Sequence, residues 1–131
     1  MPKLTLSQSH PKKIKLTLKR KSKHNLFGLF QPDNNQIIIF LNKHKNPHEL
    51  LNTLLHEISH AKGANESQAY KYAKIHSKNY KTALNASLLL IKALLNLINK
   101  KSHTTSIPTH FFPNLPNHKS KHLWIPHTYP D

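Results

Sequence analysis

Residues 46–63 read Asn-Pro-His-Glu-Leu-Leu-Asn-Thr-Leu-Leu-His-Glu-Ile-Ser-His-Ala-Lys-Gly, a pattern typical of an amphipathic helix. Asn46 is a favourable N-cap, and Pro47 suits the first helical position because its missing N–H has no partner there. Gly63 is placed to end the helix. Apolar residues recur at helical spacing within it: Leu50, Leu51, Leu54, Leu55 and Ile58. We therefore expect a helix over residues 47–62 with one face packed on the rest of the fold.

Two strand-like regions precede this helix. Residues 14–19 alternate apolar and polar side chains with a period of two, which is typical of a half-buried strand. Residues 36–42 are a β-branched apolar run, and the turn-forming residues 31–35 separate this run from residues 26–30. The pattern predicts a hairpin formed by residues 26–30 and 36–42.

Two more helices are expected after the first. One runs from Asn65 to about Lys81, and the other covers Ala83 to Lys100. The last helix is too short and too interrupted by polar residues to span a bilayer. Its apolar residues at 4-3-4-3 spacing are expected to face the core, with a helix lying on a membrane surface as the alternative. These residues are Leu84, Leu88, Ile91, Leu95 and Ile98.

These elements together predict an α+β fold. A short antiparallel or mixed sheet is expected to pack on the helix over residues 47–62 and on two further helices. Residues 101–131 contain five Pro and five His and show neither helical nor strand periodicity. We therefore expect one domain over residues 1–100, followed by an irregular, flexible His/Pro-rich tail over residues 101–131.

Composition narrows the class of protein. The 131 residues suit one small domain, and the absence of cysteine excludes disulfides, thiol catalysis and Cys-bound zinc. No apolar run of signal-peptide length is found at the N-terminus, and a cytoplasmic setting without a transmembrane segment is expected. The formal net charge is +15, and residues 1–24 carry eight basic residues and no acid. One interpretation of this charge is a nucleic-acid partner bound by the basic N-terminus. The other is a compositional bias, since 19 of the 20 basic residues are Lys.

The residues that carry chemistry are His56-Glu57-Ile58-Ser59-His60, an H-E-x-x-H motif on the expected helix. A spacing of four places the imidazoles of His56 and His60 on one helix face, one turn apart, where they can share a zinc ion. Glu57 lies beside the first of these ligands. It suits a general base that takes a proton from water activated by zinc.

A catalytic zinc ion needs a third protein ligand, for which the sequence offers two candidates. Glu66 lies six residues after His60, and Gly63 between them can adopt a positive φ that turns the chain back toward the metal. His76 on the next helix is the alternative third ligand. Glu66 is the slightly nearer of the two if that helix runs back antiparallel to the first.

At these residues the chain resembles small zincin metallopeptidases. Thr53 to Ala61 is similar to their active-site helix, and the resemblance covers residues 26–82. Glu66-Ser67-Gln68-Ala69 is similar to the Glu-x-x-Ala pattern of minimal gluzincins of the ImmA/IrrE kind, whose glutamate is the third ligand. His76-Ser77-Lys78-Asn79-Tyr80 instead resembles a segment of SprT-like proteases, whose third ligand is histidine.

The resemblance implies a zinc-dependent peptidase whose protein or peptide substrate pairs, as an extended strand, with the edge strand ahead of the motif helix, here residues 36–42. Support for an oxyanion is expected from Tyr70, Tyr72, His76 or Tyr80. Two alternatives remain open. One is a SprT-like, DNA-associated protease that uses the basic N-terminus, with Lys12, Lys13, Lys15, Lys19, Arg20, Lys21 and Lys23. The other is a non-catalytic, basic metal-binding module.

Overall fold

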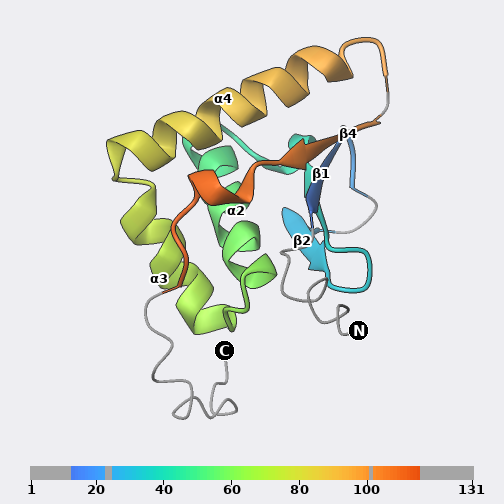
Figure 1. Cartoon of the computed structure of the whole chain (residues 1–131). Coiled ribbons are helices and arrows are strands. Elements are labelled where there is room, and N and C mark those ends of the chain that lie inside the picture. The colour runs from blue at the N-terminus through green and yellow to red at the C-terminus, as the bar shows by residue number, and fades with distance from the viewer. Residues whose placement is uncertain (1–12, 23–24, 101, 116–131) are drawn as a thin grey trace, which may run out of the picture.

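The computed structural model describes residues 13–22, 25–100 and 102–115, and Figure 1 shows their arrangement. Of two single 3-10 turns in the described residues, η1 (Leu41–Lys43) lies between β3 and α2, and η2 (Thr109–Phe111) follows β4. In chain order the main elements are β1 (Ile14–Lys19), β2 (Gly28–Gln31), β3 (Gln36–Phe40), α2 (Pro47–Ala61), α3 (Glu66–His76), α4 (Tyr80–Leu97) and β4 (Ser102–Ile107).

The described strands form a mixed sheet in the order β2-β3-β1-β4. Strands β2 and β3 are antiparallel, with Leu29 opposite Ile38, so the hairpin expected from the sequence is confirmed. Strand β1 pairs parallel with β3 and antiparallel with β4. The expected α+β class with a small mixed sheet and three helices is therefore confirmed.

Helices α2 and α4 cover one face of the sheet, and α3 packs on α2 (Figure 1). Helix α2 contacts β2 and β3, whereas α4 contacts β4 and β1. The layer between them holds side chains with no solvent exposure: Leu16, Leu18, Ile37, Ile39, Leu54, Leu55 and Ile58. On the other face the Thr17 hydroxyl lies 2.7 Å from that of Thr104 and accepts a hydrogen bond from the Gln36 side chain. One face of the sheet is thus apolar and the other is partly polar, as the alternation in β1 predicts.

The prediction of a flexible tail from residue 101 is wrong for residues 102–115. Strand β4 pairs with β1 along its whole length, Phe112 is buried, and the Tyr72 hydroxyl donates to the carbonyl oxygen of Pro113. The sequence pattern does not predict this strand, because Ser, Thr and His occupy most of it and Ile107 is its one buried residue. Its main-chain pairing with β1 needs no apolar side chains. The remaining part of the predicted tail, residues 116–131, lies outside the described residues.

Two expectations about the later helices are also wrong. The second helix ends at His76 rather than near Lys81, because Asn79 accepts a hydrogen bond from the Thr82 N–H and starts α4. The five apolar residues at 4-3-4-3 spacing in α4 do not face the core. The helix is apolar on two opposite sides, and the other side faces the core. The buried residues on that side are Thr82, Ala86, Leu89, Leu90, Ala93 and Leu97. None of the described helices has the length and hydrophobicity needed to cross a bilayer.

Candidate metal centre

A tight reversal of the chain joins α2 to α3. Gly63 has a φ of 103°, a left-handed conformation that favours glycine. The N–H of Gly63 donates to the His60 carbonyl and the N–H of Ala64 donates to the Ser59 carbonyl, which is the Schellman arrangement. The α3 helix begins three residues after Gly63, with Asn65 as its N-cap. The four residues between α2 and α3 therefore bring the first turn of α3 back beside the last turn of α2.

Asn65 fixes where α3 starts. Its side-chain oxygen accepts a hydrogen bond from the Gln68 N–H, and the Gln68 side chain accepts one from the Asn65 N–H. This capping box makes Glu66 the first helical residue. The two helices pack against each other, and the buried residues of α3 include the small Ala69 and Ala73. Glu66 is thereby directed toward the H-E-x-x-H face of α2.

His56, His60 and Glu66 converge at this point. Nε2 of His60 lies 2.8 Å from Oε1 of Glu66, and Nε2 of His56 lies 3.3 Å from the same oxygen. One ligand atom from each residue lies within 4.8 Å of the other two, so the three can hold one metal ion. In residues 13–22, 25–100 and 102–115 this is the one trio of His, Cys, Asp or Glu side chains that meets this condition.

The hydrogen bonds of His60 show that a cation suits this cluster. Its Nδ1 lies 2.9 Å from the carbonyl oxygen of Ala64, which can only accept, so Nδ1 carries the hydrogen. In the neutral ring Nε2 is then an acceptor that faces a second acceptor, the Glu66 carboxylate. Two acceptors at 2.8 Å require a proton or a metal ion between them. A carbonyl partner on the far nitrogen is also the usual support of a metal-binding histidine.

The electrostatics of the cluster favour the ligand forms of its residues. Burial lowers the pKa of His56 and outweighs the opposing effect of Glu66. The lowered pKa favours the neutral ring. Burial by itself raises the pKa of Glu66, but the facing His56 and His60 leave it below its usual value. A neutral imidazole and an ionised carboxylate are the forms that bind metal.

Glu57 lies beside the cluster and outside it. Its side chain is buried, and burial raises its pKa to about 7; His60 opposes this rise and Glu66 adds to it. Gly28 of strand β2 approaches Glu57 closely, since a Cβ built on Gly28 would lie 3.6 Å from Cγ of Glu57 and 2.9 Å from Cγ2 of Thr53. The edge of the sheet is therefore in contact with the helix that carries the motif.

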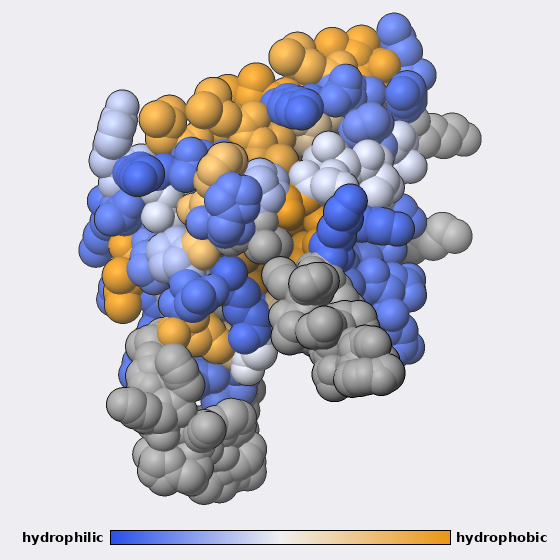
Figure 2. Space-filling model, viewed as in Figure 1, coloured by the Kyte–Doolittle hydropathy of each residue, from blue (hydrophilic) through white to orange (hydrophobic). Residues whose placement is uncertain are grey.

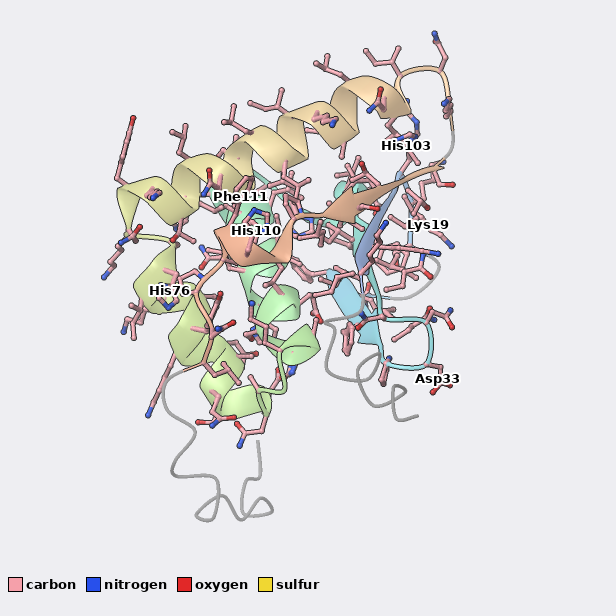
Figure 3. The ribbon with its side chains drawn as sticks, viewed as in Figure 1. Lys19, Asp33, His76, His103, His110 and Phe111 are labelled. Carbon is pink, nitrogen blue, oxygen red and sulfur yellow. The ribbon has the colours of Figure 1, made fainter. Side chains whose placement is uncertain are left out.

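His76, the alternative third ligand, is not brought into the cluster. His76 is the last residue of α3, at the end that adjoins α4 (Figure 3), whereas Glu66 is the first residue of that helix. Its ring packs on the ring of Tyr72 at 4.4 Å, and burial lowers its pKa. Of the two candidates the sequence left open, Glu66 is the one that meets both histidines of the motif.

The four residues considered for oxyanion support have different environments. Tyr70 is the one whose ring contacts the cluster, edge-on to His56 at a centroid distance of 4.7 Å. Tyr72 is buried with its hydroxyl on Pro113, and Tyr80 is exposed at the start of α4. Tyr70 is itself largely exposed, which leaves its hydroxyl accessible from solvent.

The expectation that residues 36–42 form an edge strand is wrong. Strand β3 lies between β2 and β1, and the edge nearest α2 is β2, Gly28–Gln31. The physical reason is the parallel pairing of β3 with β1, which the hairpin pattern does not reveal. A peptide that adds a strand beside the motif helix would therefore pair with β2.

The basic N-terminus is only partly described. Lys13, Lys15, Lys19 and Lys21 are exposed, whereas Lys12 and Lys23 lie outside the described residues. Arg20, the single arginine of the chain, donates to the carbonyl oxygens of Leu97 and Lys100. It therefore caps the end of α4 and holds it against β1.

Sequence reasoning missed three contributors to this centre. Gly28 gives the close approach of β2, the Ala64 carbonyl orients His60, and the Ser59 hydroxyl donates to the His56 carbonyl inside the helix. A glycine within a strand pattern is a signal for close approach, and it could have pointed to Gly28. The other two contacts depend on backbone atoms and have no sequence signal.

Comparison with family models, with curated proteins and with solved structures finds no match for this chain.

Proposed function

We propose that this protein is a zinc-dependent peptidase of the zincin type, with Glu57 as the general base. The observation that supports it is the convergence of His56, His60 and Glu66 beside the buried Glu57. A set of two histidines and one glutamate is a typical donor set for catalytic zinc, which supplies Lewis-acid polarisation of a carbonyl group and activation of a water molecule.

Glu57 is suited to hold and move a proton in this reaction. It follows the first ligand in the chain and lies on the turn of α2 between the two histidines. Its carboxylate accepts the proton of the attacking water and delivers it to the leaving nitrogen of the peptide. Because it is excluded from the ligand cluster, it remains available as a base.

The proposed substrate is a protein segment in extended conformation. Strand β2 lies at the edge of the sheet that the described residues form, next to α2, and an extended peptide can form main-chain hydrogen bonds along such an edge. The close approach of Gly28 to Thr53 and Glu57 would hold such a peptide next to the base. Recognition of this kind places weak demands on side-chain sequence.

The geometry favours the gluzincin-like subtype over the SprT-like one, because Glu66 and not His76 adjoins both histidines. It also favours a catalytic over a purely structural metal site. Structural zinc sites are closed by four protein ligands, and three side chains meet in the described part of the chain.

The test is hydrolysis of an unfolded protein such as casein and of a fluorogenic peptide mixture by the zinc-loaded chain. Glu57→Gln should retain one zinc per chain and lose activity by roughly a hundredfold or more, since its amide cannot accept the proton. Glu49→Gln, a change on the first turn of the same helix, is the matched control and should leave activity unchanged. Zinc retention with no hydrolysis by the unaltered chain would point to a non-catalytic metal module.

A further inference from the structure

The face of α4 directed away from the core carries a row of large apolar side chains. Successive members are three or four residues apart, so they lie along one side of the helix, opposite the buried face. Their side chains are between 42% and 80% exposed. We call this row the α4 stripe: Tyr80, Leu84, Leu88, Ile91, Leu95 and Ile98.

The α4 stripe is unusual for an exposed helix. A surface helix normally has a polar outer face, and a helix that is apolar on opposite sides is normally covered on both. From Leu84 to Ile98 the stripe extends for about 21 Å at 1.5 Å per residue. Figure 2 shows hydrophobic residues gathered along α4, with hydrophilic residues beside them. A continuous apolar surface of this length is typical of an interaction site.

The charged residues of α4 are all basic. The helix contains two lysines and no acidic residue. Lys81 and Lys92 are exposed on α4 itself, next to the stripe. The acids of the described chain lie elsewhere, in the β2–β3 turn, in α2 and at the start of α3. A partner that covers the stripe therefore meets the two lysines of α4 and no acidic residue of that helix.

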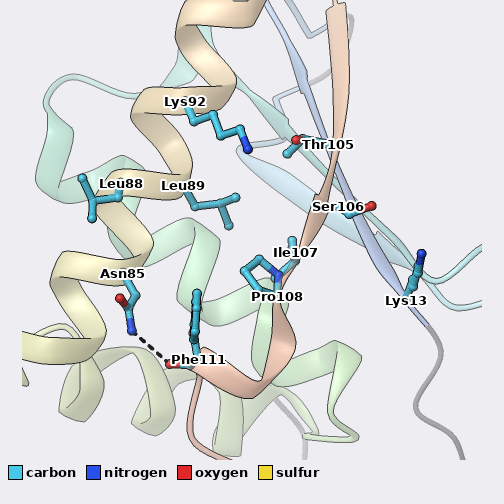
Figure 4. A pocket seen from close by; sticks show the side chains of 10 residues that line it. All are labelled: Lys13, Asn85, Leu88, Leu89, Lys92, Thr105, Ser106, Ile107, Pro108 and Phe111. Atoms are coloured by element: carbon cyan, nitrogen blue, oxygen red, sulfur yellow. Dashed lines mark hydrogen bonds between the residues drawn. The ribbon is translucent and has the colours of Figure 1, made fainter.

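A groove beside the stripe is also lined by apolar residues and lysines. It has a volume of about 480 Å³, lies between α4 and β4, and shares Leu88 with the stripe. Figure 4 shows that Lys92 extends from α4 across this groove toward Thr105, while Lys13 reaches its rim from the start of β1. The groove thus combines apolar side chains with the ammonium groups of Lys92 and Lys13.

We propose that the α4 stripe docks on the surface of an anionic lipid bilayer. The stripe would enter the boundary between headgroups and acyl chains, while Lys81, Lys92 and Lys13 meet anionic headgroups. Tyr80 suits the interface because its ring is apolar and its hydroxyl is polar. A second copy of the chain fits less well, since its border carries the same positive charge.

Docking in this way would leave the candidate metal centre open. The centre lies where α2 ends and α3 begins, and the eleven-residue α3 separates it from the start of α4. The surface used for docking and the residues proposed for catalysis are therefore distinct. Zinc binding and hydrolysis can fail without affecting the docking proposal.

The test is co-sedimentation of the full chain with vesicles of phosphatidylcholine, with and without about 30% phosphatidylserine. We expect binding to the anionic vesicles and a loss of affinity of at least about tenfold in the double variant Leu88→Gln/Ile91→Gln. The matched control is Ile75→Gln, because Ile75 is 61% exposed but belongs to α3 and not to the stripe. An unchanged melting temperature in each variant shows that the fold is retained.

A second measurement places the stripe directly. Because the chain contains no cysteine, Leu88→Cys and Ile75→Cys can each be labelled with an environment-sensitive fluorophore at one position. The label at residue 88 should shift to the blue with anionic vesicles, and the label at residue 75 should not. Equal vesicle binding by Leu88→Gln/Ile91→Gln and the unaltered chain would overturn the proposal, since lysines alone would then account for it. A dimer in solution that this variant converts to a monomer, without vesicle binding, would assign the stripe to a second copy instead.

Discussion

Oε1 of Glu66 lies 2.8 Å from Nε2 of His60, although His60 is in the last turn of α2 and Glu66 is the first residue of α3. The contact exists because Gly63 reverses the chain and Asn65 starts α3 immediately afterwards. It links two side chains that a metal ion can join, and it makes the choice of third ligand testable.

Glu66→Ala should weaken zinc binding far more than His76→Ala. A ligand present at a hundredfold excess over its Kd stabilises a fold by about 2.7 kcal/mol. For a domain of this size that corresponds to a melting temperature higher by roughly 10 °C. We expect this rise on adding zinc to the unaltered chain and to His76→Ala, and its absence in Glu66→Ala. The measurements are thermal unfolding with zinc and with a chelator, and metal content per chain. Loss of zinc from His76→Ala alone would favour the SprT-like alternative.

Gly28→Ala should destabilise the protein by about 1–3 kcal/mol, because the added Cβ would lie 2.9 Å from Cγ2 of Thr53 and 3.1 Å from the Ile38 carbonyl oxygen. The double variant Gly28→Ala/Thr53→Ser should recover part of the loss. Serine removes the methyl group and keeps the hydroxyl that bonds to His44. Urea unfolding of the two variants, with Thr53→Ser alone as control, measures the recovery. No recovery would mean that the Ile38 carbonyl and not Thr53 limits the space.

The effect of His44→Gln on stability should depend on pH. Nδ1 of His44 lies 3.0 Å from the Phe40 carbonyl and carries the hydrogen, so neutral Nε2 accepts from the Thr53 hydroxyl. Burial lowers the pKa of His44. The folded state then binds fewer protons than the unfolded state near pH 6, so the contribution of His44 is complete above pH 6.5 and is lost as the pH falls below it.

We therefore expect His44→Gln to cost about 1 kcal/mol at pH 8 and progressively less toward pH 5. The measurement is the difference in unfolding free energy between the variant and the unaltered chain, at each pH and with a chelator present. Glu57, with its raised pKa, shifts stability in the opposite direction with pH, and taking the difference removes its effect. A cost that is constant from pH 8 to pH 5 would contradict the assigned hydrogen bonds.

Truncation after Leu115 should preserve the fold, whereas truncation after Lys100 should abolish it. The shorter chain loses β4 and the buried side chains of Ile107 and Phe112. Burial of these two is worth roughly 3–6 kcal/mol, a large part of the stability of a small domain. Circular dichroism and size-exclusion chromatography of the two truncated chains test this. A folded, monomeric chain ending at Lys100 would show that β4 is dispensable.

The sequence predicts the cluster of His56, His60 and Glu66 better than the sheet. The centre depends on local signals within about twenty residues: a capped helix, the spacing of His56 and His60, and a glycine before Glu66. Each signal has a physical cause that acts within a few residues along the chain, so each could be recognised without the tertiary structure.

The errors of prediction concern contacts between distant segments. The strand character of Ser102–Ile107 depends on its pairing with β1, and the position of β3 inside the sheet depends on the same strand. The orientation of α4 could not be decided from periodicity, because Leu88 and Leu89 lie on different faces and both are apolar. Packing of α4 against β4, α2 and β1 determines which of the two is buried.

The pairing of β1 with β4 also affects the order of folding. Thr17 and Thr104 are hydrogen-bonding partners 87 residues apart. During synthesis β1 therefore cannot pair with β4 until residues 102–107 have been made. Closing so long a loop is a slow step, whereas the turn between α2 and α3 closes over a few residues. The His56, His60 and Glu66 side chains can therefore meet early on the folding pathway, and a metal ion present at that time would be bound before the sheet is complete.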